Sequence, residues 1–359
     1  MKTPLLAQQP TSSRIEWIET LKGITVLLVV MHHATLASQS WFLAGGGSTL
    51  PEGLLQFDKI MSNFRMPAFF LCSGLVFAST MQKGTRWFIE KRILGASWII
   101  LVWTIAYYVY EISGIPLIPW NSEFLQTSQA IWAPAGHLWF MYALIICSLT
   151  SFIVQGLSCR NKILISLLLS LLATYLGSVA HAPIGIVVTL DGLGASGFFF
   201  FMTGAALGNT GVRMVENPRT LLMMSTLSVA LIALYIAFGN KTWLQDLVGI
   251  RTPSTLIFVS FIFLASTNSV IFSRVFSSIG SISLRIFLVH QIPISLGLML
   301  LMVFFSFDNP ISFWLILVIT GIVGSLILQK ITYVLSGGLA YTPPNWLKFP
   351  TLKNVRCAH

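Results

Sequence analysis

Residues 19–33 read Glu19-Thr-Leu-Lys22-Gly-Ile-Thr-Val-Leu-Leu-Val-Val-Met-His32-His33, and the apolar character continues to Phe42. A membrane-spanning helix needs about 20 mostly apolar residues, and residues 21–42 meet that requirement. The polar lead-in is long and contains Glu16 as well as Glu19, which is not typical of a cleaved signal peptide. We therefore expect a retained first transmembrane helix that carries ionisable side chains.

The composition of the whole chain agrees with this first helix. Only 9% of the 359 residues are charged and 55% are hydrophobic, and the mean hydropathy is +0.82. Ordinary soluble domains have roughly a quarter of their residues charged, so these values exclude a soluble globular protein and a disordered chain. The net charge of +10 is not gathered in a dense basic run, so we expect no nucleic-acid partner.

The hydropathy pattern predicts an all-α, polytopic membrane protein with about ten transmembrane helices. We expect one domain over residues 1–359, with a helical core at about 14–331 and a cytosolic tail at 332–359. The predicted helices are 21–42, 60–81, 93–112, 137–156, 163–180, 193–209, 220–238, 254–272, 284–305 and 311–331.

The distribution of positive charge predicts the orientation of these helices. If the N-terminus lies in the cytosol, 17 of the 21 Lys and Arg residues fall on the cytosolic side. Cytosolic loops of membrane proteins carry such an excess, so we expect both termini in the cytosol and a multi-pass protein of the cell membrane, the bacterial inner membrane. The long outer segment 113–136 holds two Trp residues, which serve as interfacial anchors or belong to a loop that covers a site.

Ionisable residues on the first helix form the strongest candidate site, because charged groups inside a membrane are costly and are often functional. Lys22 and His33 lie within about 20° of the same helix face and about 16 Å apart along the axis. Taken singly, Lys22 is typical of a snorkelling residue and His33 of a histidine bonded between helices. The aligned pair, with Glu19 one turn from Lys22, favours a functional site. His32 is rotated by about 100°, which leaves open which histidine faces that site.

A second polar cluster lies in the stretch Asn63-Phe-Arg65-Met-Pro67-Ala-Phe-Phe-Leu-Cys-Ser73-Gly74. A proline inside a helix kinks it and frees a carbonyl that needs a partner. Arg65 either faces a site near the outer side or extends outward to the interface. Ser73 and Gly74 are typical of close helix packing.

Basic and polar residues elsewhere give further candidates. Lys91 and Arg92 lie at the predicted cytosolic mouth of the third helix, where they represent either ordinary positive-inside charge or a phosphate-binding edge. His137 begins a helix at the outer face, and an interfacial role would explain it equally well. His290 lies well inside the ninth predicted helix, and we expect Asp191 to cap the start of the sixth.

Five motifs follow one another along the chain: Glu19 through Lys22-Gly23 to His33, Met66-Pro67 to Ser73-Gly74, Trp87-Phe88 to Arg92, Leu138-Trp139-Phe140, and Ile282-Ser283 to His290. Taken in order, they resemble the acyltransferase-3 family of membrane O-acyltransferases, which acetylate cell-surface sugars. The resemblance spans about residues 14–330. Three positions depart from the family pattern: Lys22 stands where Arg is usual, Glu19 where Asp is usual, and Gly95 where a second Arg often follows Arg92.

The resemblance implies an enzyme that transfers an acyl group, here acetyl, from a cytosolic acyl-CoA donor such as acetyl-CoA to a hydroxyl of an extracytoplasmic carbohydrate or glycan precursor. It implies His33 as the general base or the acyl carrier, with Glu19 beside it in the catalytic set. Lys22, Arg92 and Lys91 would bind the donor. Arg65, His290 and His137 would line the acceptor side. No metal is expected, and the oligomeric state is open.

A transporter or flippase for a small polar solute or glycan precursor is the competing interpretation. Interior charges and broken helices also occur in transporters. The polar residues here gather at one end of the first helix and do not form a relay across the membrane, and no internal repeat is visible, which favours the enzyme.

Overall fold

The computed structural model describes residues 16–44, 49–81, 83–112, 138–180, 184–238, 246–304 and 309–347, which form helices and turns without a strand. The elements used below are α1 (Glu16–Ala44), α2 (Glu52–Met81), α3 (Thr85–Phe88), the π-helical turn η1 (Ile89–Leu94), α4 (Gly95–Ile112), α5 (Trp139–Ile153), α6 (Cys159–Val179), α7 (Ile184–Gly192), the π-helical turn η4 (Leu193–Gly197), α8 (Phe198–Glu216), α9 (Pro218–Phe238), the π-helical turn η5 (Leu247–Arg251), α11 (Thr252–Asn268), α12 (Val270–Ser281), α13 (Ser283–Val289), α14 (Gln291–Phe304) and α15 (Pro310–Leu335).

Within these ranges, eight continuous helical segments are long and apolar enough to cross a membrane. The bent pair α12–α13 would make a ninth, and two shorter apolar helices, Trp139–Ile153 and Gln291–Val303, accompany them. The chain is therefore an all-α polytopic membrane protein, as its hydropathy predicts. The count of ten helices and the sides of the two termini stay predictions.

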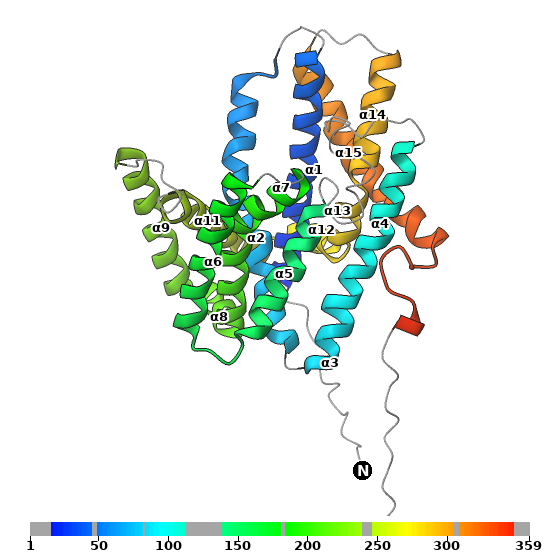
Figure 1. Cartoon of the computed structure of the whole chain (residues 1–359). Coiled ribbons are helices and arrows are strands. Elements are labelled where there is room, and N and C mark those ends of the chain that lie inside the picture. The colour runs from blue at the N-terminus through cyan, green and yellow to red at the C-terminus, as the bar shows by residue number, and fades with distance from the viewer. Residues whose placement is uncertain are drawn as a thin grey trace, which may run out of the picture.

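Helix α1 occupies the centre of the bundle. It contacts α2, α11, α12, α13, α14 and α15, and Figure 1 shows it between α2 and the pair α14–α15. Its fully buried residues Val26, Val30, Ala34 and Ala37 recur every three or four positions, so they share one helix face. Small and β-branched side chains on that face let neighbouring helices approach closely. The candidate residues of α1 are thereby surrounded by other helices.

Two pairs of glycines allow this close approach. A Cβ atom added to Gly23 would collide with the carbonyl oxygen of Phe276, and one added to Gly280 would collide with that of Glu19, so α1 and α12 touch backbone to backbone. Gly74 and Gly204 play the same part between α2 and α8, which agrees with the packing role expected for Gly74. Tight contacts through small residues are the usual device of membrane helices.

Several elements differ from their predicted bounds. Helix α2 begins at Glu52 and not near 60, and the third span begins at Thr85 through η1 and not at 93. The segment predicted as one helix over 284–305 is divided into α13 and α14, which meet at His290. Residues 270–281, expected mostly as a cytosolic connection, form α12, which is bent by 58° relative to α13.

The chain after α15 packs back onto the bundle. Helix α15 continues to Leu335, past the predicted start of the tail at 332. The indole N–H groups of Trp98 and Trp103 on α4 then donate to the carbonyl oxygens of Leu339 and Ala340, each over 2.8 Å. These bonds tie Leu339 and Ala340 of the predicted tail to α4.

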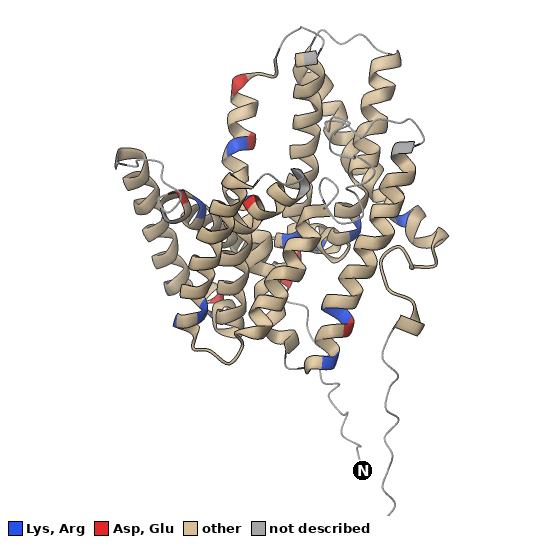
Figure 2. Ribbon diagram, viewed as in Figure 1, with Lys and Arg blue, Asp and Glu red and all other residues tan. Residues whose placement is uncertain are grey.

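Charged residues are thinly spread over the bundle. Figure 2 shows long uncharged stretches of helix, Lys and Arg at several of the lower helix ends, and charges of both signs on the upper part of α2. Asp58 and Lys59 lie in this part of α2. Hydropathy assigned this upper part of α2 to a loop, and Asp58, but not the exposed Lys59, belongs to the site described next.

Candidate active site

Three histidines lie in contact at the centre of the bundle. The ring of His33 on α1 lies 4.9 Å from that of His290, at the α13–α14 junction, and the rings of His32 and His33 lie 5.2 Å apart, measured between centroids. His33 is 8% exposed and His290 is fully buried. The structure thus brings together two predicted site residues that are more than 250 positions apart in the chain.

The backbone around His290 fixes its ring. The Nδ1 atom of His290 lies 2.6 Å from the carbonyl oxygen of Phe287. Because a carbonyl oxygen only accepts hydrogen bonds, Nδ1 carries the proton and Nε2 carries the lone pair. The hydroxyl of Tyr107 on α4 donates to the next carbonyl, that of Leu288, over 2.7 Å. The third span therefore holds the segment that presents His290.

An acidic residue that sequence reasoning missed joins this cluster. The carboxylate of Asp58 on α2 lies 2.8 Å from Nδ1 of His32 and 3.2 Å from Nη1 of Arg65. Arg65 is 5% exposed, so it turns inward and does not snorkel. Asp58 and Arg65 are seven residues apart, which is two helical turns on one face. This seven-residue spacing would predict that Asp58 and Arg65 share a helix face. The hydropathy pattern did not predict it, because the helix expected from that pattern began at residue 60.

Lys22 and Glu19 form a separate pair toward the start of α1. The Lys22 Nζ atom lies 2.9 Å from both carboxylate oxygens of Glu19. Helix α1 is unbroken from Glu16 to Ala44, so Glu19 lies about 21 Å along the axis from His33. Glu19 and His33 therefore cannot act on the same reacting atom. The expected alignment of Lys22 with His33 follows from the same continuous helix.

Arg92 and Lys91 lie in η1, a π-helical turn of the third span. Such turns occur frequently at functional sites. The guanidinium carbon of Arg92 is 5.9 Å from the centre of the Phe77 ring, whereas Lys91 is exposed. Among the ion pairs of the described residues, none includes Arg92. Within the described ranges, its positive charge therefore has no acidic partner beside the end of α2.

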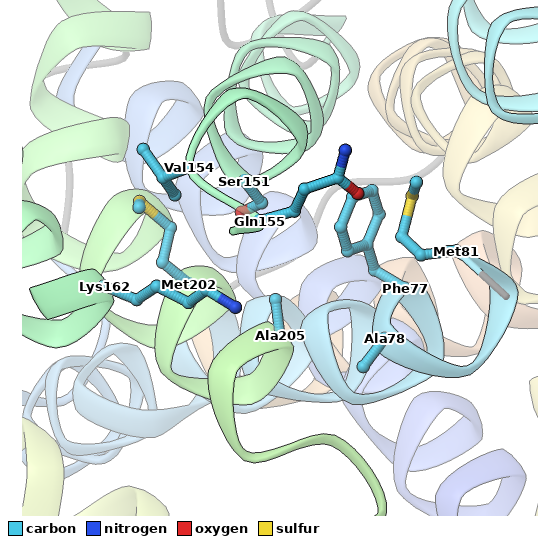
Figure 3. A pocket seen from close by; sticks show the side chains of 9 residues that line it. All are labelled: Phe77, Ala78, Met81, Ser151, Val154, Gln155, Lys162, Met202 and Ala205. Atoms are coloured by element: carbon cyan, nitrogen blue, oxygen red, sulfur yellow. The ribbon is translucent and has the colours of Figure 1, made fainter. Parts of the chain in front are cut away.

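A cavity of about 220 Å³ opens beside Phe77. Figure 3 shows the Lys162 side chain extending beneath Met202 toward Ala205, with Gln155 and Phe77 on the other side. The Ser151 hydroxyl also lines the cavity, is buried, and bonds to no other described residue. The cavity combines an ammonium group, an amide and a hydroxyl with apolar walls. Its lining residues are Phe77, Ala78, Met81, Ser151, Val154, Gln155, Lys162, Met202 and Ala205.

The remaining candidates divide into two groups. His137 and the outer segment 113–136 lie outside the described residues. The prediction that Asp191 caps the start of a helix is wrong, because Asp191 lies in the last turn of α7. Its carboxylate lies against Gly177 on α6.

Comparison with known proteins shows to which family this sequence belongs. A family model described as an acyltransferase domain, that of the acyltransferase-3 family, matches residues 15–330, nearly the whole chain. No curated protein and no solved structure matches the chain. The family model confirms the resemblance and covers the three histidines, Asp58 and the Lys22–Glu19 pair together.

Proposed function

We propose, because the chain belongs to the acyltransferase-3 family, that it transfers an acetyl group from cytosolic acetyl-CoA to a hydroxyl of an extracytoplasmic carbohydrate or glycan precursor. His33 is the reactive group in this proposal, as the base that takes the acceptor proton or as the carrier of the acyl group. The acyl transfer itself is what the family supports. The donor, the acetyl group and the acceptor are our proposal.

The observation that carries the proposal is the position of His33. It lies on the central helix, in contact with His32 and His290, and is nearly excluded from solvent. Histidine titrates near neutral pH, which suits a base or a transient acyl carrier. Exclusion of water from such a site favours transfer to the acceptor over hydrolysis of the acyl group.

The donor would enter at the end of the helix bundle opposite to the end that holds Asp58. Arg92 and the cavity with Lys162 offer positive charge to the phosphates of a CoA thioester. The apolar and amide-bearing walls of the cavity suit its thin pantetheine arm. Lys22, about 16 Å from His33 along α1, lies on the helix face that leads toward the histidines.

The test is transfer of labelled acetyl groups in membranes that contain the protein. Membranes with the wild-type chain are incubated with labelled acetyl-CoA, and label in the glycan fraction is measured. We expect His33→Ala to abolish the label, while Lys59→Gln, which changes an exposed residue of α2, keeps it. Full transfer by His33→Ala at normal protein level would contradict the role of His33.

A transporter or flippase is the second candidate, and one feature of the fold favours it. The bent pair α12–α13 resembles the discontinuous helices that form substrate sites in transporters. The same membranes discriminate the two functions. Covalent label in the glycan supports the enzyme, whereas movement of an unmodified solute across the membrane, without covalent label, supports the transporter.

A further inference from the structure

The His32–Asp58–Arg65 contact suggests a second reactive group beside His33. The side chains of Asp58 and Arg65 are 15% and 6% exposed, and that of His32 is 24% exposed. An arginine bonded to a carboxylate holds it in place and keeps it ionised. An imidazole that is fixed by a carboxylate is the arrangement of a general base whose orientation is set by a second residue.

The hydrogen bonds determine which nitrogen of His32 is available. An ionised carboxylate only accepts hydrogen bonds, so Asp58 keeps the His32 proton on Nδ1. The lone pair is then on Nε2, which is free to take a proton from another molecule. His290 is held in the same tautomer by the carbonyl of Phe287, but it is fully buried.

The three histidines differ in how far they reach the surface. His290 is fully buried, His33 is 8% exposed, and about a quarter of the His32 side chain is exposed. Asp58 lies about 9 Å along the axis from the Glu52 end of α2, which is the predicted outer end. Of the three imidazoles, His32 is therefore the one that a molecule approaching from this end meets first.

We propose that His32 is the general base for the acceptor hydroxyl, that Asp58 positions it, and that His33 carries the acyl group between donor and acceptor. This inference rests on the proposed acyl transfer and assigns separate roles to the two adjacent histidines. Arg65 acts through Asp58 by holding its carboxylate against His32.

The chemistry balances over the two steps. In the first step a nitrogen of His33 attacks the thioester carbon, a C–N bond forms, the C–S bond breaks, and the CoA thiolate leaves and takes up one proton. In the second step the acceptor oxygen attacks the acyl carbon and its proton passes to Nε2 of His32. The C–O ester bond forms as the C–N bond to His33 breaks. His32 then releases one proton, which balances the proton gained by the thiolate.

The experiment separates the two steps in membranes that contain the full chain. Labelled acetyl-CoA without acceptor measures acylation of the protein, and added glycan acceptor measures transfer. We expect Asp58→Asn and His32→Gln to acylate at the wild-type rate but to transfer to the glycan roughly 100-fold more slowly, the usual contribution of general base catalysis. Asp58→Glu should recover part of the transfer rate, and Lys59→Gln serves as the control on the same helix.

A nucleophile that needs no base supplies a further readout. Hydroxylamine should discharge the acylated wild-type protein and the acylated Asp58→Asn variant at equal rates, because its nitrogen attacks without prior loss of a proton. A purely structural defect would slow both acylation and discharge.

Three results would overturn the inference: normal glycan transfer by both variants, equal loss of acylation and transfer, or a wild-type protein that transfers acetyl groups without ever carrying label. The last of these leaves the proposed function intact. If His33→Ala loses transfer while His32→Gln transfers normally, the proposed acyl transfer stands and the role of His32 as the base is refuted.

Discussion

At the scale of single residues, the Lys22–Glu19 pair allows a test of donor binding. The two side chains are 24% and 13% exposed and lie one helical turn apart. Because both are largely buried, removing one partner leaves a poorly solvated charge and lowers stability. The amount of folded protein is therefore measured for each variant, and the kinetic constants are compared per folded molecule.

If Lys22 contacts the phosphates of the donor, Lys22→Ala should raise the KM for acetyl-CoA about tenfold, which is the loss of one charge-assisted hydrogen bond. Lys22→Arg keeps the charge and should stay within about twofold of wild type. Glu19→Gln removes the partner but not the ammonium group, and it serves as the matched control. An unchanged KM in Lys22→Ala would exclude Lys22 from the donor site.

Within the site, the sequence predicts the placement of residues on one helix but not the contacts between helices. The alignment of Lys22 and His33 followed from the helical repeat alone, because both residues lie on one continuous helix. The contact of His32 with Asp58 joins residues 26 positions apart on two helices. That contact depends on how α1 and α2 pack, which no local pattern encodes. Asp58 was therefore missed although the charge itself was visible in the sequence.

At the scale of helices, hydropathy located the spans but placed several of their ends wrongly. Residues 52–59 contain Glu52, Asp58 and Lys59, so their low hydropathy predicted a loop, whereas the structure continues α2 through them. The division of 284–305 at His290 was missed because both halves are equally apolar. The break near Ile282, with φ −114° and ψ 11°, follows Gly280, whose close contact with α1 is a tertiary feature.

The contact between α1 and α12 predicts a strong effect of small substitutions. Gly23→Ala and Gly280→Ala each place a methyl group against the backbone of the opposite helix. Overpacking of this kind costs about 1–3 kcal/mol, and it should lower the thermal midpoint of the detergent-solubilised protein. Gly53→Ala is the matched control, because a Cβ atom there meets nothing within 4 Å and alanine favours helix by about 1 kcal/mol. Equal stability of Gly23→Ala and Gly53→Ala would contradict the tight packing.

At the scale of the whole molecule, the cavity of Figure 3 combines residues from α2, α5, α8 and the start of α6. No single segment of the sequence predicts it. If it receives part of the donor, Lys162→Ala should raise the KM for acetyl-CoA by roughly tenfold, the cost of one lost charge-assisted hydrogen bond, with little change in kcat. Arg160→Ala removes an exposed charge two residues away and should not. Equal effects of the two substitutions would indicate general attraction of an anion and not binding in the cavity.

The side of the membrane on which this cavity opens decides whether a cytosolic donor reaches it. Cys159 is the exposed first residue of α6, and Val154, Gln155 and Lys162 of the cavity wall lie close to it along the chain, while Cys72 and Cys147 are buried. Figure 1 shows the turn between α5 and α6 at the opposite end of the bundle from the start of α2. The excess of Lys and Arg predicts that the Cys159 end is cytosolic.

In a Cys357→Ser background, a thiol reagent that does not cross membranes should therefore leave Cys159 unlabelled in intact cells and label it in inside-out vesicles. Lys59→Cys, near the start of α2, should give the opposite result. Labelling of Cys159 in intact cells would place the cavity outside, where no acyl-CoA is available. That result would refute the cytosolic entry of the donor, while leaving the family and the histidine cluster unaffected, because neither depends on the orientation of the bundle.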